Sequence, residues 1–124
     1  MPHPHLTSTV AADLFEVQTN VKLYHWKTKS YSRHKAADEL HSQLQALGDS
    51  LIETMSTRYG RPDNTHEIVV RVKDLTDSSI IGYLEKYCKT VNGYKFDKTH
   101  TDLMSIRDDI LAAVNKSLYL MSLN

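Results

Sequence analysis

The chain has 124 residues, and 15 basic and 15 acidic side chains give it a formal net charge of zero. This length suits one domain with one modest core, so we expect a single domain over residues 1–124. Zero net charge leaves no overall basic field to attract nucleic acid or anionic lipid, and no apolar run is long enough to span a membrane.

The N-terminus and the single cysteine bear on the compartment in which the chain works. The first residues, MPHPHLT, lack the charged and apolar regions of a secretory signal. We expect residues 1–7 to form a flexible N-terminus, because prolines interrupt this segment. Cys88 is the only cysteine, so no internal disulfide can form. A reducing compartment fits this composition, and we expect a cytoplasmic protein.

Helical spacing of apolar residues begins near the N-terminus. The pattern predicts a first helix over about residues 9–29, with Thr7 or Ser8 placed to cap its open N–H groups. Its apolar face consists of Val10, Leu14, Val17, Val21 and Tyr24.

A second and longer helical pattern follows a short polar turn at residues 30–32. It predicts a helix over about residues 33–59, stopped by Gly60 and Pro62. Its apolar stripe consists of Ala37, Leu40, Leu44, Leu47, Leu51 and Met55.

Residues 61–77 show no helical period. Within them HEIVVRV (66–72) is short and β-branched, which favours an extended segment. A third helix is predicted over about residues 78–91 and ends at Asn92 and Gly93. Its apolar face consists of Ile80, Ile81, Leu84, Tyr87 and Val91.

The last helical pattern begins near residue 99 and runs almost to the end of the chain. Thr99 and Asp102 have the spacing of a capping box, with Asp in place of the usual Glu. Its inner face consists of Leu103, Ile106, Ile110, Ala113, Ser117 and Leu120.

The lengths of the connections select a topology. Short turns join the first helix to the second and the third to the fourth, so each pair forms an antiparallel hairpin. The middle connection, 61–77, could extend to roughly 55 Å, which exceeds the ~40 Å length of the second helix. We therefore predict an all-α, ferritin-like four-helix bundle with a long crossover between helices two and three.

Four metal-binding residue types recur along one side of the second helix. His34, Asp38, Asp49 and Glu53 follow the spacing 4, 11, 4, which places them in a sector roughly 100° wide. Imidazole and carboxylate ligands suit a divalent metal such as iron. Asp38 and Asp49 are ~16 Å apart along the helix, so one ion cannot join both ends. Two chains packed antiparallel about a two-fold axis would bring the two half-sites together.

The face that carries these residues points away from the leucine stripe. The stripe lies roughly 120° around the helix, so the metal-binding set should face outward from the chain's own bundle. Gln45, Gly48 and Ile52 lie in or beside this outward sector. Gly48 would allow close approach of another helix, and Ile52 would give a partner an apolar contact. These positions favour a dimer interface.

The stretch YHWKTKSYSRHKAADELHSQLQALGDSLIE resembles the ferroxidase segment of the Dps-type mini-ferritins. That family carries a His-Trp pair late in its first helix, here His25 and Trp26. Its second helix then carries a His-x3-Asp-x10-Asp-x3-Glu series. The interval from His25 to His34 is shorter in this chain than in that family. The resemblance covers roughly residues 10–60.

The resemblance implies a function and an assembly. The chain would oxidise Fe(II) to Fe(III) with peroxide or oxygen, store the ferric product and protect against oxidative damage. One subunit would supply His25, His34 and Asp38, and its two-fold mate would supply Asp49 and Glu53. The homo-oligomer would be at least a two-fold dimer, and a dodecameric cage is the larger form that the family implies.

The same resemblance gives roles to aromatic neighbours of the site. Trp26 would shield the site and intercept oxidising radicals. Independently of the resemblance, Tyr24 and Tyr31 are near enough in the sequence to lie close to the ligands. We interpret His41, one turn beyond Asp38, as a surface or interface histidine and not as a ligand.

Two other classes of function fit the same residues. One is a metal-binding helical protein that does not oxidise iron, and the other is a metal-free helical module whose His- and acid-rich face binds a protein. A closed structural zinc site is disfavoured because the set contains no thiolate. We expect no useful binding of DNA, because neither end of the chain is a lysine-rich tail.

Overall fold

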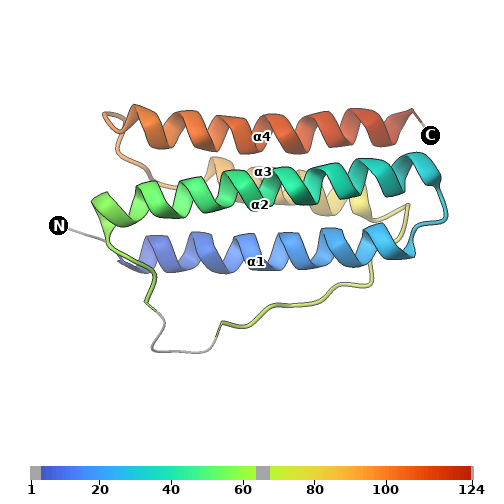
Figure 1. The fold of residues 1–124 in the computed structure, drawn as a ribbon, viewed down its shortest axis with the longest axis horizontal. Helices are drawn as coiled ribbons and strands as arrows, with labels where there is room; N and C mark the ends of the chain where they lie inside the picture. The colour runs from blue at the N-terminus through green and yellow to red at the C-terminus, as the bar shows by residue number, and fades with distance from the viewer. Residues whose placement is uncertain (1–3, 64–67, 124) are drawn as a thin grey trace.

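The computed structural model describes residues 4–63 and 68–123. Its four helices are α1 (Pro4–Lys27), α2 (Tyr31–Tyr59), α3 (Ile80–Asn92) and α4 (Thr101–Ser122) (Figure 1). The described residues contain no strand, so the prediction of an all-helical chain with four helices is confirmed. None of the helices in these residues is long and apolar enough to cross a membrane.

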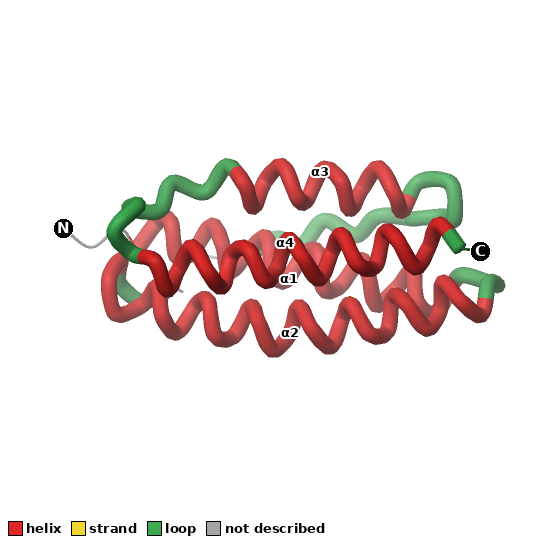
Figure 2. Tube along the Cα trace, turned by 90° about the horizontal axis from the view of Figure 1, so that it is seen from above, coloured by secondary structure: helices red, strands yellow, loops and turns green. Residues whose placement is uncertain are grey.

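The helices lie side by side along the long axis of the molecule. Following the colours from blue to red, α1 and α4 run in one direction and α2 and α3 run in the other (Figure 1). Seen from above, α2 and α3 lie on opposite sides of the pair formed by α1 and α4 (Figure 2). The two short turns therefore each join antiparallel neighbours, as the sequence predicts.

The connection between α2 and α3 runs back beside α1. Residues 68–73 within it form neither helix nor strand, so no sheet pairs with the β-branched segment. Three of its apolar side chains, Ile68, Val69 and Val72, are exposed. Hydrogen bonds tie the connection to α1 at successive levels: Asp63 N–H to Ser8 Oγ (2.7 Å), Arg71 N–H to Glu16 Oε1 (2.9 Å), Lys73 N–H to Asn20 Oδ1 (2.7 Å) and Tyr24 Oη–H to Asp77 Oδ1 (2.7 Å).

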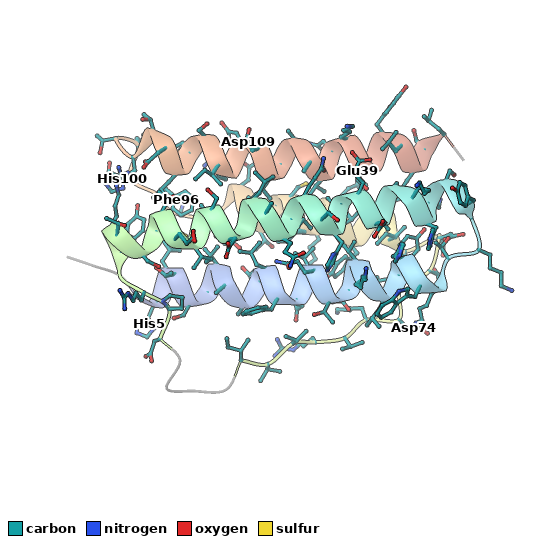
Figure 3. All side chains as sticks on the ribbon, viewed as in Figure 1. His5, Glu39, Asp74, Phe96, His100 and Asp109 are labelled. Carbon is teal, nitrogen blue, oxygen red and sulfur yellow. The ribbon has the colours of Figure 1, made fainter. Side chains whose placement is uncertain are left out.

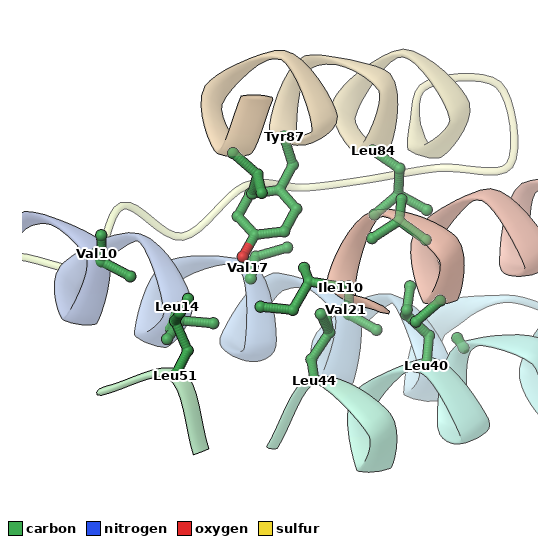
Figure 4. Close-up of a cluster of buried hydrophobic side chains, with 14 of the residues drawn as sticks. Val10, Leu14, Val17, Val21, Leu40, Leu44, Leu51, Leu84, Tyr87 and Ile110 are labelled. Atoms are coloured by element: carbon green, nitrogen blue, oxygen red, sulfur yellow. The ribbon is translucent and has the colours of Figure 1, made fainter. Parts of the chain in front are cut away.

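The core sits between the helices and follows the apolar faces that the sequence predicts. Figure 4 shows its central part, where side chains from all four helices meet. Leu47 is only partly buried, because it lies at the edge of the α2 stripe. The inner face of α4 is wider than predicted, because Val114 and Met121 are also buried. The buried residues that the sequence predicts are Val10, Leu14, Val17, Val21, Tyr24, Ala37, Leu40, Leu44, Leu51, Met55, Ile80, Leu84, Tyr87, Val91, Leu103, Ile110, Ala113 and Ser117.

The start of α1 differs from the prediction. The helix begins at Pro4, so residues 4–7 of the expected flexible N-terminus form its first turn, and residues 1–3 lie outside the described residues. A proline is tolerated there because the first N–H groups of a helix have no intrahelical partner. Thr7 and Ser8 therefore do not cap the helix. Thr7 is fully buried and Ser8 binds the connection.

Other helix ends correct the predicted turns. α2 begins at Tyr31, two residues early, because the Ser30 hydroxyl caps it by accepting a hydrogen bond from Arg33 N–H. It ends at Tyr59 and is followed by Gly60, which has the positive φ of 96° that favours glycine. The capping box predicted for α4 is wrong, because the Thr99 hydroxyl donates to Asp97 at 2.7 Å and His100 occupies the cap position.

Polar contacts close both ends of the bundle (Figure 3). At one end Lys27 of α1 forms an ion pair with Asp74 of the connection. At the other end the hydroxyl of Tyr59 lies 3.0 Å from Nδ1 of His100, and its ring stacks on Phe96.

Candidate metal half-site

His25 and His34 form a reciprocal pair across the turn between α1 and α2. Nδ1 of His25 lies 2.8 Å from the carbonyl oxygen of His34, and Nδ1 of His34 lies 2.8 Å from that of His25. The two rings stack with centroids 3.9 Å apart and an interplanar angle of 18°. The carbonyl of His25 belongs to the last turn of α1, where carbonyls lack helical partners. The pair therefore caps α1 and fixes the turn.

These hydrogen bonds determine which ring nitrogens remain available. A carbonyl oxygen only accepts, so Nδ1 of each ring carries the hydrogen and donates it. In the neutral ring Nε2 then keeps its lone pair. Histidines that bind metals usually have this arrangement, with the other ring nitrogen donating to a carbonyl or a carboxylate. Both histidines are thus prepared to offer Nε2 to an ion.

Asp38 adds a carboxylate next to the pair. Its Oδ1 lies 3.8 Å from Nε2 of His25, and its side chain is about half exposed. The ammonium of Lys22 lies 3.8 Å from the same oxygen and 5.6 Å from the ring centroid of Trp26. We call His25, His34 and Asp38 the histidine half-site.

Two neighbours of the half-site had no place in the predicted ligand set. Lys22 supplies a cation that lies beside Asp38 and would compete with a metal for its carboxylate. Burial lowers the pKa of His41, and the nearby Lys22 lowers it further, while Asp38 acts in the opposite direction. His41 is therefore close enough to sense the half-site charges. The sequence spacing could have predicted that Lys22 lies near the half-site, because Lys22 is one helical turn before His25 on α1.

The histidine half-site is incomplete within one chain. The lone pair of each Nε2 lies in its ring plane, and the two planes are nearly parallel, with ring centroids 3.9 Å apart. The two lone pairs therefore do not converge on one ion unless a ring rotates. In the described part of the chain, no three His, Cys, Asp or Glu side chains are gathered closely enough to hold a metal.

Asp49 and Glu53 lie at a distance from the histidine half-site. α2 continues without a break from Tyr31 to Tyr59, so Asp38 and Asp49 remain ~16 Å apart along it. Both Asp49 and Glu53 are exposed. We call these two residues the acidic half-site. Of the five predicted ligands, the structure places Asp38 and His34 each beside His25, and it leaves the other two at a separate place on α2.

Gly48 serves the chain's own packing, which corrects its predicted place in a dimer interface. It is buried, and a Cβ atom added to it would lie 2.9 Å from Cδ2 of Leu14 on α1. The close approach therefore joins α1 to α2. Beside this contact lies a groove of about 400 Å³, whose lining includes Phe15, Asp49 and Ile52.

The aromatic residues predicted near the ligands differ in their surroundings. Trp26 and Tyr31 are 66% and 75% exposed. The ring of Tyr31 lies 6.4 Å from that of His34. Tyr24 is buried, and its hydroxyl donates to Asp77 at 2.7 Å, so it supports the connection. Phe15, which no sequence motif indicates, is 52% exposed and lies on the same side of α1 as Trp26, 11 residues away.

Comparison with known proteins places the chain in a family without assigning an activity. A family model described as "Family of unknown function (DUF5856)" matches residues 25–121. No curated protein matches the chain. No solved structure matches it either. The matched region contains both half-sites, all of α2 and α3, and α4 except its last residue. The chain therefore belongs to DUF5856, a family of unknown function.

Proposed function

We propose that this protein binds Fe²⁺ and oxidises it with peroxide or oxygen at a site shared between two subunits, in the manner of the Dps-type mini-ferritins. The observation that carries this proposal is the hydrogen-bonding state of His25 and His34. Each Nδ1 is committed to a carbonyl, so each Nε2 is left for a metal, and Asp38 stands beside one of them. Iron storage and oxidative protection follow as the expected roles.

The helix arrangement supports the ferritin-like part of the proposal. α2 and α3 run in the same direction, and the connection between them returns beside α1 (Figure 1). This connection acts as the long crossover of a ferritin-like bundle. In such bundles, metal sites are built from side chains on facing helices, which suits ligands placed on α1 and α2.

A second subunit is needed to complete the site. The two half-sites are ~16 Å apart along α2, and an antiparallel copy of α2 would bring each against its complement. The α1 face that shares this surface exposes Trp26 at one end and Phe15 at the other. Exposed aromatic residues of this size are typical of protein interfaces. The same two-fold axis would place Trp26 near the partner's groove beside Asp49.

The ligand types suit the chemistry. The mixed nitrogen and oxygen set leaves positions open for an oxidant. With peroxide, two Fe²⁺ ions each lose one electron, the O–O bond breaks, and the two electrons leave both oxygens at the level of hydroxide. The residues of this chain would hold the ions, and Asp49 and Glu53 would neutralise the added positive charge. For both Nε2 atoms to face one ion, one histidine ring must rotate and give up its hydrogen bond to the carbonyl; without rotation, each Nε2 faces an ion separately.

Mixing two inactive variants tests the shared site. The first variant carries His34→Asn and Asp38→Asn, since an asparagine amide can still donate to the His25 carbonyl. The second carries Asp49→Asn and Glu53→Gln at exposed positions, so little stability should be lost. Each alone should lose Fe²⁺ oxidation. Refolding equal amounts together gives about half mixed dimers, each with one complete site, so about a quarter of parental activity should return.

A matched control and a mass measurement make this result decisive. Glu39→Gln changes another carboxylate of α2 that pairs with Lys116 of α4, and it should keep full activity. Subunit exchange is confirmed by native mass spectrometry of isotope-labelled chains. No recovery despite confirmed exchange would refute the shared site. Binding of Fe²⁺ without oxidation would instead assign a non-catalytic metal-binding protein, and neither binding nor oxidation would assign an interaction module.

A further inference from the structure

A separate cavity lies between α1, α3 and the connection that joins α2 to α3. Its volume is about 310 Å³, which is at the lower end of the range for small-molecule sites. None of the five proposed iron ligands lines it. The cavity therefore has its own chemistry, independent of the proposed iron site.

Two carboxylates of α1 form one wall of the cavity. Oδ2 of Asp13 accepts a hydrogen bond from the Tyr94 hydroxyl at 2.7 Å, and Oε1 of Glu16 accepts one from the Arg71 backbone at 2.9 Å. In the part of the chain that the structure describes, their other oxygens accept no hydrogen bond. Burial raises the pKa of Asp13 and the neighbouring charge of Glu16 raises it further, although the Tyr94 bond opposes them. A cation in the cavity would relieve this unfavourable environment.

Two tyrosines of α3 offer hydroxyl groups to the same space. Tyr87 is 8% exposed and reaches from α3 toward Val17 of α1 (Figure 4). Its hydroxyl has no hydrogen-bond partner among the described residues. The hydroxyl of Tyr83 accepts from Asn20 at 2.9 Å, and its own proton goes to no described residue. Each hydroxyl therefore keeps a proton that it can donate to a ligand in the cavity.

Three cationic side chains complete the lining. Arg71 and Lys73 come from the connection and Lys86 comes from α3. None of them forms an ion pair with another described residue. Among the described residues, the lining thus carries three cations that form no ion pair and two carboxylates, an excess of one positive charge.

We propose that this cavity binds a small α-amino dicarboxylate. The ammonium group of the ligand lies against Asp13 and Glu16. Its two carboxylates lie against the cations Arg71, Lys73 and Lys86 and accept from the tyrosine hydroxyls. A ligand with one positive and two negative groups matches both the arrangement and the net charge of the lining, which a purely anionic or purely cationic ligand does not.

Calorimetric titration with three related compounds tests the proposal. L-Glutamate carries all three groups, glutarate lacks the amine, and 4-aminobutyrate lacks the α-carboxylate. L-Glutamate should bind, and each of the other two should bind about tenfold to hundredfold more weakly, because each leaves charged hydrogen-bonding groups unpaired.

Two variants locate the binding. Glu16→Gln keeps an oxygen for the Arg71 backbone and removes the charge, and it should abolish the preference for L-glutamate over glutarate. Lys86→Gln should weaken L-glutamate by about tenfold. Lys89→Gln removes a charge from α3 at a residue that does not line the cavity, and it should bind as the parent does.

The opposite results would overturn the proposal. These are no heat from L-glutamate up to about 10 mM, equal binding of glutarate, or unchanged binding in both Glu16→Gln and Lys86→Gln. Circular dichroism confirms that each variant is folded. Iron oxidation is not a readout here, so failure of the iron proposal leaves this test unaffected.

Discussion

Replacing Gly48 or Gly82 with alanine should change the stability of the protein differently, because alanine favours the helix at both positions but meets a close contact only at Gly48. Glycine in the middle of a helix costs about 1 kcal/mol relative to alanine. A Cβ atom at Gly82 in α3 would meet nothing within 4 Å, so Gly82→Ala should stabilise the protein by about 0.5–1 kcal/mol. At Gly48 the Cβ would lie 2.9 and 3.1 Å from the two Cδ atoms of Leu14, which is 4% exposed.

The contact with Leu14 should reverse the gain at Gly48. Overpacking of a core costs about 1–3 kcal/mol, so Gly48→Ala should range from neutral to about 2 kcal/mol destabilising. Urea unfolding followed by circular dichroism measures both variants against the parent. Adding Leu14→Val shortens the opposing side chain, so Gly48→Ala should cost less in that background, as a double-mutant cycle would show.

One result would refute this reasoning. If Gly48→Ala stabilised the protein as much as Gly82→Ala, the close approach of α1 and α2 at this level would not exist. A loss of self-association without a loss of stability would return Gly48 to the intermolecular role that the sequence predicts for it. Sedimentation of the same samples separates these two outcomes.

Three further predictions concern pH, association and DNA. Hydrogen bonds from Tyr24 and then from Thr28 lower the pKa of Asp77. The stability that Asp77 contributes is therefore complete above its unfolded pKa of 3.8 and is lost as the pH falls through its lower folded pKa. Asp77→Asn should make the free energy of unfolding depend less on pH on the acid side. Trp26 is the only tryptophan, so its fluorescence should shift to the red when dilution separates the subunits. Trp26→Ala should weaken self-association by about tenfold or more. Tyr119→Ala, at a similarly exposed site on α4, should leave self-association unchanged. Duplex DNA should not be retarded in gels at about 0.15 M salt, and retardation that weakens steeply with added salt would reveal a basic patch.

Periodic features of the fold could be predicted from the sequence. The apolar faces of the four helices repeat at helical spacing, and burial follows that spacing because one side of each helix packs on the others. The position of Gly60 also predicted the end of α2, since glycine accepts its positive φ of 96° at no steric cost. The start of α1 was less predictable, because proline can begin a helix as well as break a chain.

Features that depend on contacts between helices could not be predicted. No sequence pattern indicates that His25 and His34 donate to each other's carbonyl groups, because these hydrogen bonds depend on the geometry of the turn. Helical spacing predicts which face of α2 carries Gly48, but it does not predict which helix packs against that face. The sequence therefore suggested a partner chain at Gly48, where the structure places α1. The cavity of Asp13 and Tyr87 joins segments more than 50 residues apart, which share no motif.

The buried side chain of Asn20 has a consequence for which insertions the chain can tolerate. Its amide donates to the Arg71 carbonyl and the Tyr83 hydroxyl, and its oxygen accepts from Lys73 N–H. Because Asn20 bonds both ends of the segment from Lys73 to Tyr83, it fixes the length of that segment. An insertion there would break one of these bonds, whereas extra residues among residues 68–70, which form neither helix nor strand, would lengthen the connection at a small entropic cost. Insertions and deletions in members of the family should therefore occur mainly before Arg71.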